Sequence, residues 1–321
     1  MATESTDKFS DEMLMMGKTN NSLAITIDIE DWYHIPSVCG SPFSVYQDTE
    51  TFFEAWKERY DYLTQPTQLV LDLLRKHDIK ATFFVVAEVA RHYPGLIESI
   101  VENGHEIACH GLHHACKIDP KTKKPLMDKK TFETQTRLAK NILEKIAGVP
   151  VIGYRAPNAL IAGWMINSLE DLGFRYDSSV SANSLYNKTD SPLSGVTTRP
   201  YYPHRHSLEP GPDTRGILEF PFAYYDRGIK IPTSGGPMLR FLGGTLILQG
   251  LKQSLERGDT IFYFHPIDIA REKFPTIGNK RPLYWLFKGK VIENRINWIL
   301  NKLSRNGVKM CPVRELNRVM S

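Results

Sequence analysis

The sequence predicts an α/β protein built as a distorted (β/α) barrel of seven or eight mainly parallel strands. Short apolar runs rich in β-branched and aromatic residues alternate with longer segments whose apolar residues recur at helical spacing. This alternation, repeated seven or eight times, favours a mainly parallel sheet covered by helices. The number of units and the length of 321 residues suit a closed or nearly closed barrel better than an open doubly wound sheet.

Eight short apolar runs are the strand candidates. The first, LAITIDI, and the second, ATFFVV, are typical of strands that are buried on both faces. The eight candidates are Leu23–Ile29, Ala81–Val86, His105–Cys109, Val151–Tyr154, Phe174–Tyr176, Ile217–Phe222, Thr260–Phe264 and Val308–Pro312.

The helices are predicted between these runs. One begins at a proline and ends before Asn103–Gly104, and a long one ends at Gly148, both common helix boundaries. The predicted helices are Gln65–His77, Pro94–Glu102, Asp128–Ala147, Ala162–Leu172, Leu239–Arg257 and Val291–Asn306, with a short one at the end of the chain. Tyr186–Arg215 has no periodicity and is predicted to be a long surface loop.

The chain is expected to form one domain. Residues 1–20 are polar and mixed in charge, and we expect a disordered or loosely attached tail there. Residues 21–321 contain no linker and no internal repeat, so they are predicted to be a single catalytic domain.

Composition narrows the functional class. With 40 basic and 36 acidic side chains the net charge is only +4, which does not indicate a nucleic-acid partner. The N-terminal region lacks the apolar core of a signal peptide, and no apolar run is long enough to span a membrane. The four cysteines form no CxxC pair, as expected for reduced thiols. These features predict a cytoplasmic protein without a transmembrane segment.

Polar side chains follow five of the predicted strands. In a parallel β/α barrel the carboxyl ends of the strands share one mouth, where active sites lie. The polar groups at these ends are therefore expected to meet. They are the acidic cluster Asp28, Glu30 and Asp31, the histidines His110 and His114, and the single residues Arg155, Asp177 and His265.

The histidine pair indicates a metal site. His110 and His114 are spaced i, i+4, and on one helical turn both imidazoles would lie on the same side. An HxxxH pair alone is a weak signal, but the acidic cluster strengthens it. Imidazole together with carboxylate suits Zn²⁺, and also Co²⁺, Ni²⁺ or Fe²⁺. The predicted cofactor is therefore a divalent metal ion, with Zn²⁺ preferred.

The motifs resemble those of the polysaccharide deacetylases of carbohydrate esterase family 4, the NodB homology domain. The resemblance is carried by ATFFVVAEVARHYPGLIESIVENGHEIACHGLHH, GYRAP, RYDSSV and FYFHP, and it extends from about Leu23 to about Val313. The first motif, DIED, matches the branch of this family that reads D-[IV]-E-D. The resemblance implies a NodB-like barrel and a metal-dependent hydrolase of amide bonds.

The resemblance also implies the metal ligands. Asp31 or Glu30 would bind the metal together with His110 and His114. On a regular strand Asp28 and Glu30 share a face and Asp31 points away, although a bend after Asp28 would reverse this. Asp31 is preferred slightly because an aspartate is the family's metal ligand, and Glu30 remains the alternative.

Catalytic roles follow from the same resemblance. Asp28 would be the catalytic base, and Arg155 would orient it and keep it ionised. His265 would be the general acid that protonates the leaving amine, and Asp177 would hold His265 in its protonated form. The candidate substrate contacts are Trp32, Tyr154 and Pro157, although Trp32 suits packing at the barrel rim equally well.

The expected function is removal of an N-acetyl group from an amino sugar during surface polysaccharide biosynthesis. The substrate would be a sugar nucleotide, a lipid-linked glycan or an oligosaccharide, and the sequence does not indicate an oligomeric state. Two alternatives remain. One is another amide hydrolase on the same scaffold, a deformylase or an allantoinase-like enzyme, and the other is a catalytically inactive carbohydrate-binding protein.

Overall fold

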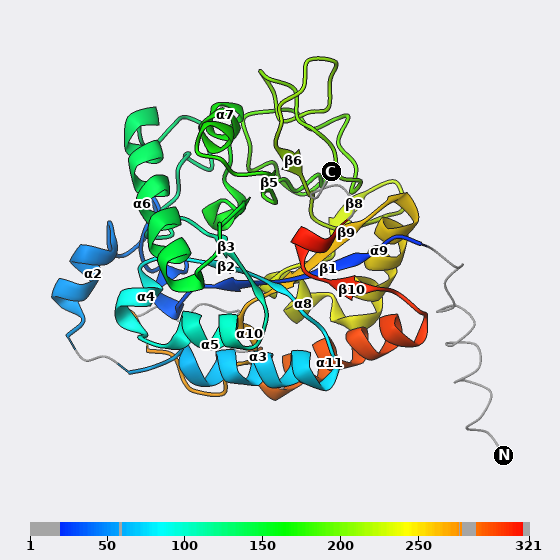
Figure 1. Ribbon diagram of the computed structural model, residues 1–321, viewed down its shortest axis with the longest axis horizontal. Helices are drawn as coiled ribbons and strands as arrows, with labels where there is room; N and C mark the ends of the chain where they lie inside the picture. The colour runs from blue at the N-terminus through cyan, green and yellow to red at the C-terminus, as the bar shows by residue number, and fades with distance from the viewer. Residues whose placement is uncertain (1–19, 58–59, 276, 278–286, 317–321) are drawn as a thin grey trace.

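The structure is a computed structural model that describes residues 20–57, 60–275, 277 and 287–316. Apart from Asn20, the predicted N-terminal tail lies outside the described residues. The polypeptide forms a curled parallel sheet surrounded by helices (Figure 1). Within the described part of the chain, no helix has the length and apolarity needed to cross a membrane.

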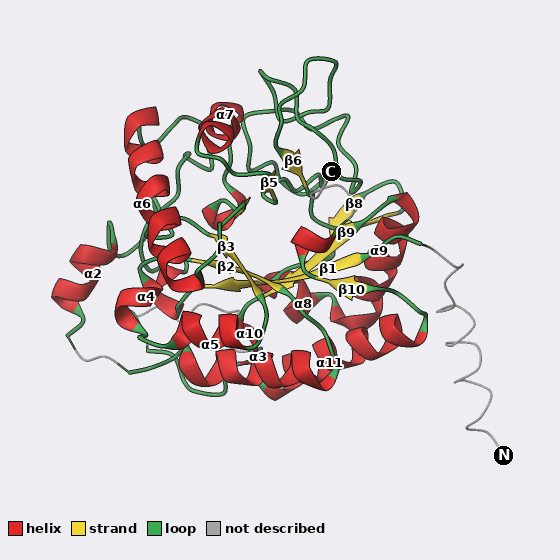
Figure 2. Ribbon diagram, in the orientation of Figure 1, coloured by secondary structure: helices red, strands yellow, loops and turns green. Residues whose placement is uncertain are grey.

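The central sheet has eight strands, and every pairing within it is parallel (Figure 2). The strands are β1 (Leu23–Ile29), β2 (Thr82–Val85), β3 (Glu106–Cys109), β4 (Gly153–Tyr154), β5 (Tyr176–Asp177), β6 (Leu218–Glu219), β9 (Thr260–Phe264) and β10 (Met310–Cys311). Seven of them run in the order β9-β1-β2-β3-β4-β5-β6, and β10 pairs with the first residues of β1. A single parallel bridge between Phe222 and Ile261 joins the end of this row to its beginning. The predicted distorted barrel is confirmed.

The helices cover the outside of the sheet (Figure 1). They are α2 (Thr49–Ala55), α3 (Thr64–Lys76), α4 (Val89–His92), α5 (Leu96–Glu102), α6 (Lys129–Ala147), α7 (Gly163–Asp171), α8 (Gly236–Phe241), α9 (Gly243–Arg257), α10 (Pro266–Ile269) and α11 (Lys290–Arg305), with the 3-10 turns η1 (Trp32–His34), η2 (Pro157–Ala159) and η4 (Val313–Glu315). The prediction of one continuous helix over Leu239–Arg257 is wrong in one respect, because the helix is interrupted between α8 and α9. Gly243 adopts a left-handed φ of +76° at this break.

Successive side chains of β1 point alternately to the outside and to the inside of the barrel. Leu23, Ile25, Ile27 and Ile29 pack against the surrounding helices as part of the main apolar cluster. Ala24 belongs instead to the cluster inside the barrel, with Phe84 and Ala108. Thr26 and Asp28 share the face of Ala24, so the carboxyl end of β1 presents polar side chains to the barrel interior.

Two further segments complete the fold. The strands β7 (Tyr224–Asp226) and β8 (Lys230–Pro232) form an antiparallel hairpin that packs on α9 and was not predicted. The predicted loop 186–215 contains no helix or strand, although isolated bridges such as His204 to Thr214 tie it together. The short final helix is the 3-10 turn η4.

Candidate metal and hydrolytic site

The carboxyl end of β1 places Asp28 and Glu30 in one cavity of about 350 Å³. The two side chains continue the inward-facing alternation of the strand, and both are buried. Arg155, His110, His114 and His265 line the same cavity, so the structure brings together most of the residues predicted from the strand ends.

His110 and His114 lie in the loop that follows β3. The spacing was predicted to act through a helical turn, and this is wrong, since Gly111 and His114 both have left-handed φ values of +82° and +55°. The loop nevertheless brings the two Nε2 atoms to 3.2 Å from each other. Each Nδ1 faces a backbone carbonyl, that of Arg155 at 2.8 Å and that of His34 at 3.0 Å. Each Nδ1 therefore carries the proton, and both Nε2 lone pairs point into one space.

Glu30 completes a set of three donor atoms around this space. Its Oε2 lies 2.5 Å from Nε2 of His114 and 3.9 Å from Nε2 of His110. All three donor atoms lie within 4.8 Å of one another. Tetrahedral Zn²⁺ places its nitrogen ligands about 3.3 Å apart, close to the separation of the two imidazoles. Neither Nε2 atom has a proton to donate to the other, because the proton of each ring is on Nδ1. The two Nε2 lone pairs and the carboxylate of Glu30 therefore suit a divalent cation.

Asp31, the preferred metal ligand in the sequence analysis, points elsewhere. Its Oδ1 accepts a hydrogen bond from the backbone N–H of Trp32 at 2.7 Å, and its Oδ2 accepts one from the hydroxyl of Tyr93. Asp31 thereby caps η1 outside the cavity. No bend after Asp28 reverses the regular alternation of the strand, so the geometry corrects the preference from Asp31 to the alternative, Glu30.

Electrostatics favour an ionised carboxylate beside neutral imidazole. Burial raises the pKa of Glu30, but the neighbouring His114, His265 and His110 outweigh it and hold this pKa well below its ordinary value. Burial lowers the pKa of His110 to about 4, which keeps its ring neutral. Neutral imidazole and ionised carboxylate are the forms that bind metal ions.

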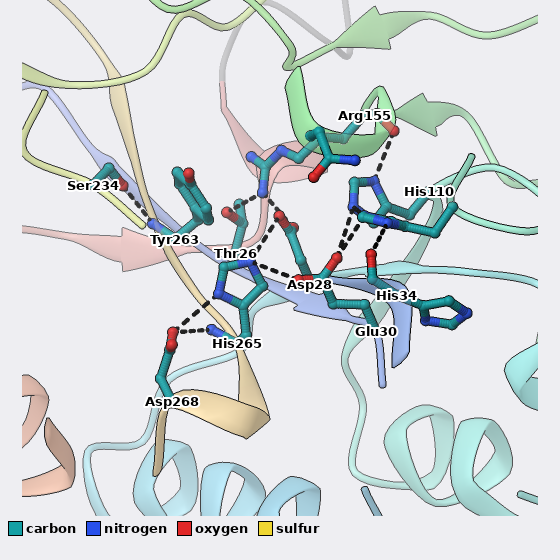
Figure 3. Close-up of polar contacts among 12 residues, drawn as sticks. Thr26, Asp28, Glu30, His34, His110, Arg155, Ser234, Tyr263, His265 and Asp268 are labelled. Carbon is teal, nitrogen blue, oxygen red and sulfur yellow. Dashed lines mark hydrogen bonds and ion pairs between the residues drawn. The ribbon is translucent and has the colours of Figure 1, made fainter. Parts of the chain in front are cut away.

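Arg155 holds Asp28 in a buried ion pair (Figure 3). Its Nη1 lies 2.6 Å from Oδ1 of Asp28 and donates a second hydrogen bond to Oγ1 of Thr26 at 3.0 Å. Nε donates to the carbonyl of Ser178, and the guanidinium lies 4.0 Å from the ring centre of Phe84. Because its other donors are bonded within the barrel, Arg155 is held in place and in turn fixes the position of the Asp28 carboxylate.

His265 lies across the cavity from the histidine pair, at the start of α10 (Figure 3). Its Nδ1 is 3.0 Å from Oδ2 of Asp268, and its Nε2 is 3.4 Å from Oε1 of Glu30 and 3.9 Å from Oδ2 of Asp28. Burial lowers the pKa of His265, but Asp268, Glu30 and Asp28 outweigh it and raise this pKa to about 9. Arg240 donates in turn to Oδ1 of Asp268.

Asp177 does not hold His265, which corrects the predicted role. Its Oδ1 accepts a hydrogen bond from Ser179 at 2.8 Å, and it lies opposite Glu219 in the pairing of β5 with β6. Asp268 takes the expected position because α10 starts with a capping box, in which the third helical residue turns back to its cap. The sequence signal for this contact is the three-residue spacing from His265 to Asp268.

The predicted substrate contacts lie apart from the cavity. Trp32 is only 3% exposed and packs edge-on against Phe52 and Trp56. Tyr154 is fully buried, and Pro157 is buried beside Gly111. None of these three residues lines the cavity that contains Asp28 and Glu30. Lys188, from the segment that was predicted as a loop, does line it.

Glu88 supports the site indirectly, through hydrogen bonds to His34 and His113, a role that the sequence analysis missed. Its Oε1 accepts a hydrogen bond from Nε2 of His34 at 2.7 Å, and its Oε2 lies 2.7 Å from Nδ1 of His113. The ring of His34 also accepts the backbone N–H of Asp31, while the carbonyl of His34 accepts from His114. Glu88 therefore fixes the turn that orients one of the candidate metal ligands.

Comparison with known proteins finds two segments of the chain that match family models. Residues 54–176 match the polysaccharide deacetylase family, and residues 186–309 match a domain of unknown function, DUF3473. The first of these segments is therefore similar to the polysaccharide deacetylases, enzymes that hydrolyse amide bonds of N-acetylated sugars. The site combines both matched segments, because His110, His114 and Arg155 lie in the first and His265 in the second.

Individual relatives of the chain are also named as deacetylases. The chain is 29% identical over 151 residues to a peptidoglycan deacetylase-like protein of Gibberella zeae, covering 46% of this chain and 42% of the relative. It is 27% identical over 136 residues to a peptidoglycan-N-acetylglucosamine deacetylase of Bacillus cereus, covering 38% of this chain and 46% of the relative. The chain thus spans less than half the length of these relatives. A crystal structure from Mycobacterium smegmatis, assigned to the polysaccharide deacetylases, shares the fold with a TM-score of 0.58 and 18% identity, covering 94% of this chain and 91% of that one.

Proposed function

We propose that this protein is a metal-dependent hydrolase that removes an N-acetyl group from an amino sugar. The observation that carries the proposal is one cavity in which three converging ligands, Glu30, His110 and His114, lie beside a carboxylate and a protonated histidine. A divalent metal ion held by the three ligands would lower the pKa of water and polarise the acetamide carbonyl.

The chain's own residues supply the proton transfers. Asp28, held in position by Arg155, is placed to accept a proton from the attacking water. His265 carries a proton on Nε2 and is placed to donate it to the departing amine. Asp268 accepts from Nδ1 of His265 and so orients the ring. Base and acid are therefore separate groups that reach the cavity from different strands, Asp28 from β1 and His265 from the end of β9.

The substrate class follows from the family and from the cavity. We propose an N-acetylated sugar nucleotide, lipid-linked glycan or oligosaccharide, used in the synthesis of a surface polysaccharide in the cytoplasm. We further propose that residues 21–321 act as one domain, since the sheet that holds the site uses strands from Leu23 to Cys311.

The test is acetate release from a panel of N-acetylated sugar nucleotides, glycolipid precursors and oligosaccharides. The protein would be assayed after chelation and again after Zn²⁺ or Co²⁺ is restored. We expect release that disappears with chelator and returns with metal. Tight metal binding without release from any member of the panel would contradict a sugar de-N-acetylase and favour another amide hydrolase.

A further inference from the structure

A second cavity, of about 270 Å³, lies beside the turn that follows Glu30. Glu30 lines the first cavity and the next residue, Asp31, lines the second, so the turn separates them. The walls come from η1, α2, residues 60–64 and α4, and the helices α2 and α4 are neighbours (Figure 1). The ring centres of Phe53 in α2 and His92 in α4 are 4.6 Å apart. None of the proton-transfer residues proposed above lines this cavity.

Aromatic side chains dominate the lining of this second cavity. Trp32 packs edge to face against Phe52 and Trp56, and Tyr60 and Tyr62 lie 4.8 Å apart between ring centres. The wall also has an open side, since Tyr60 is 62% exposed. Aromatic faces bind cations, and they also stack on the apolar faces of ring-shaped ligands.

Two acidic side chains contribute to this lining, and burial raises the pKa of one of them, Asp31, to about 7. Asp31 and Asp61 both line the cavity, and its described lining includes neither lysine nor arginine. Asp61 accepts hydrogen bonds from the backbone N–H groups of Leu63 and Thr64 at 3.0 and 2.8 Å, and no ion pair forms with either carboxylate among the described residues. Tyr33 adds a buried hydroxyl that has no hydrogen-bond partner within the described part of the chain.

We propose that this cavity binds a sugar that carries a protonated amino group. Its ammonium group would approach Asp61 and Asp31, and its ring would stack on Trp56 and Tyr60. This inference rests on the proposed function, because hydrolysis of a neutral acetamido sugar leaves a cationic amino sugar. A binding site for that product class beside the hydrolytic site would favour glycans that are already partly deacetylated.

The experiment measures binding without turnover. The full-length Asp28→Asn protein would be titrated with an oligosaccharide of glucosamine and with its fully N-acetylated counterpart of equal length. Tryptophan fluorescence reports on the site because Trp32 and Trp56 line it, and calorimetry gives an independent affinity. The same titrations on Asp61→Asn and Trp56→Ala test the cavity, and Tyr202→Ala is a matched control at an exposed aromatic residue elsewhere.

We expect the glucosamine oligosaccharide to bind more tightly than the acetylated one, and each cavity variant to lose about tenfold in affinity for it. The side-chain amide introduced by Asp61→Asn can still accept from Leu63 and Thr64, so the start of α3 should persist, which circular dichroism would verify. Unchanged binding in both cavity variants would overturn the inference. The inference would also be overturned if both oligosaccharides bound with equal affinity and Asp61→Asn had no effect. The cavity would then be a neutral stacking surface.

Failure of the proposed function gives a different result. A protein that releases no acetate from any substrate, yet binds the glucosamine oligosaccharide through Asp61 and Trp56, contradicts the hydrolase alone. A protein that releases acetate but shows no cavity-dependent binding contradicts the second site alone.

Discussion

At the scale of single residues, the site depends on which carboxylate faces His265. Asp268 contacts its Nδ1, whereas Asp177 lies opposite Glu219. We therefore expect Asp268→Asn to reduce kcat by about 10²–10⁴-fold, the usual contribution of a general acid, and Asp177→Asn to leave kcat close to the parent value. Steady-state assays of both variants, normalised to folded protein, provide the comparison. A large loss in Asp177→Asn with little loss in Asp268→Asn would restore the assignment made from sequence.

A substitution at Asp28 tests the role of the catalytic base independently of metal binding. Asp28→Asn removes the proton acceptor but none of the three candidate ligands, so we expect kcat to fall about 10²–10⁴-fold with metal content unchanged. The variant leaves Arg155 buried without its counter-ion, and we expect a stability loss of about 3–5 kcal/mol. Metal analysis and chemical unfolding test both effects. Turnover at the parent rate would exclude Asp28 as the base.

At the scale of elements, the turn after β1 depends on Glu88 for its shape. Glu88 holds the ring of His34, and the backbone carbonyl of His34 orients His114. We expect Glu88→Ala to weaken metal affinity about 10–100-fold, as is typical for groups that orient metal ligands. A chromophoric chelator in competition measures this affinity. Glu102→Ala, at an exposed glutamate of α5, should leave it unchanged, and equal affinity in both variants would contradict the role of Glu88.

Close packing between β4 and β5 supports the strand that delivers Arg155. A Cβ atom on Gly153 would overlap the ring of Tyr176, which is fully buried. We expect Gly153→Ala to lower the free energy of unfolding by about 1–3 kcal/mol, because the ring must shift within a packed interior. Gly163→Ala is the control, since its nearest neighbours lie at 3.7 Å. Urea unfolding of both variants tests the prediction, and equal midpoints would refute it.

For the whole molecule, local patterns predicted the sheet but not every side-chain contact. The apolar runs predicted β1 and β9 with their observed bounds, because buried parallel strands need continuous apolar sequence. The position of Asp31 depends on how the chain caps η1, and that of Asp268 on how α10 begins. Both positions depend on the conformation of the chain where a helical turn begins, which the three-residue spacing from His265 to Asp268 permits but does not specify. The hairpin β7–β8 and the aromatic cavity likewise arise from segments with no clear period.

A buried pair of acidic residues, where β5 pairs with β6, makes the free energy of unfolding depend on pH. Asp177 and Glu219 are paired across the two strands. Neither Oδ2 of Asp177 nor Oε2 of Glu219 has a hydrogen-bond partner among the described residues. Burial raises the pKa of Asp177, and burial together with Asp177 raises the pKa of Glu219 well above its ordinary value. The folded protein therefore retains a proton between the two carboxyl groups.

This retained proton sets the sign of a pH effect on the stability of the whole protein. Above the ordinary glutamate pKa of 4.5 the unfolded chain releases a proton that the folded chain keeps. This contribution to the free energy of unfolding is complete at low pH and is lost as the pH rises towards the folded-state pKa. Glu219→Gln supplies a neutral side chain whose amide can donate to Asp177, so we expect its stability relative to the parent to increase with pH. Urea unfolding of both proteins at about pH 5 and about pH 8 measures that difference. A difference that stays constant or falls with pH would show that the pair does not share a proton.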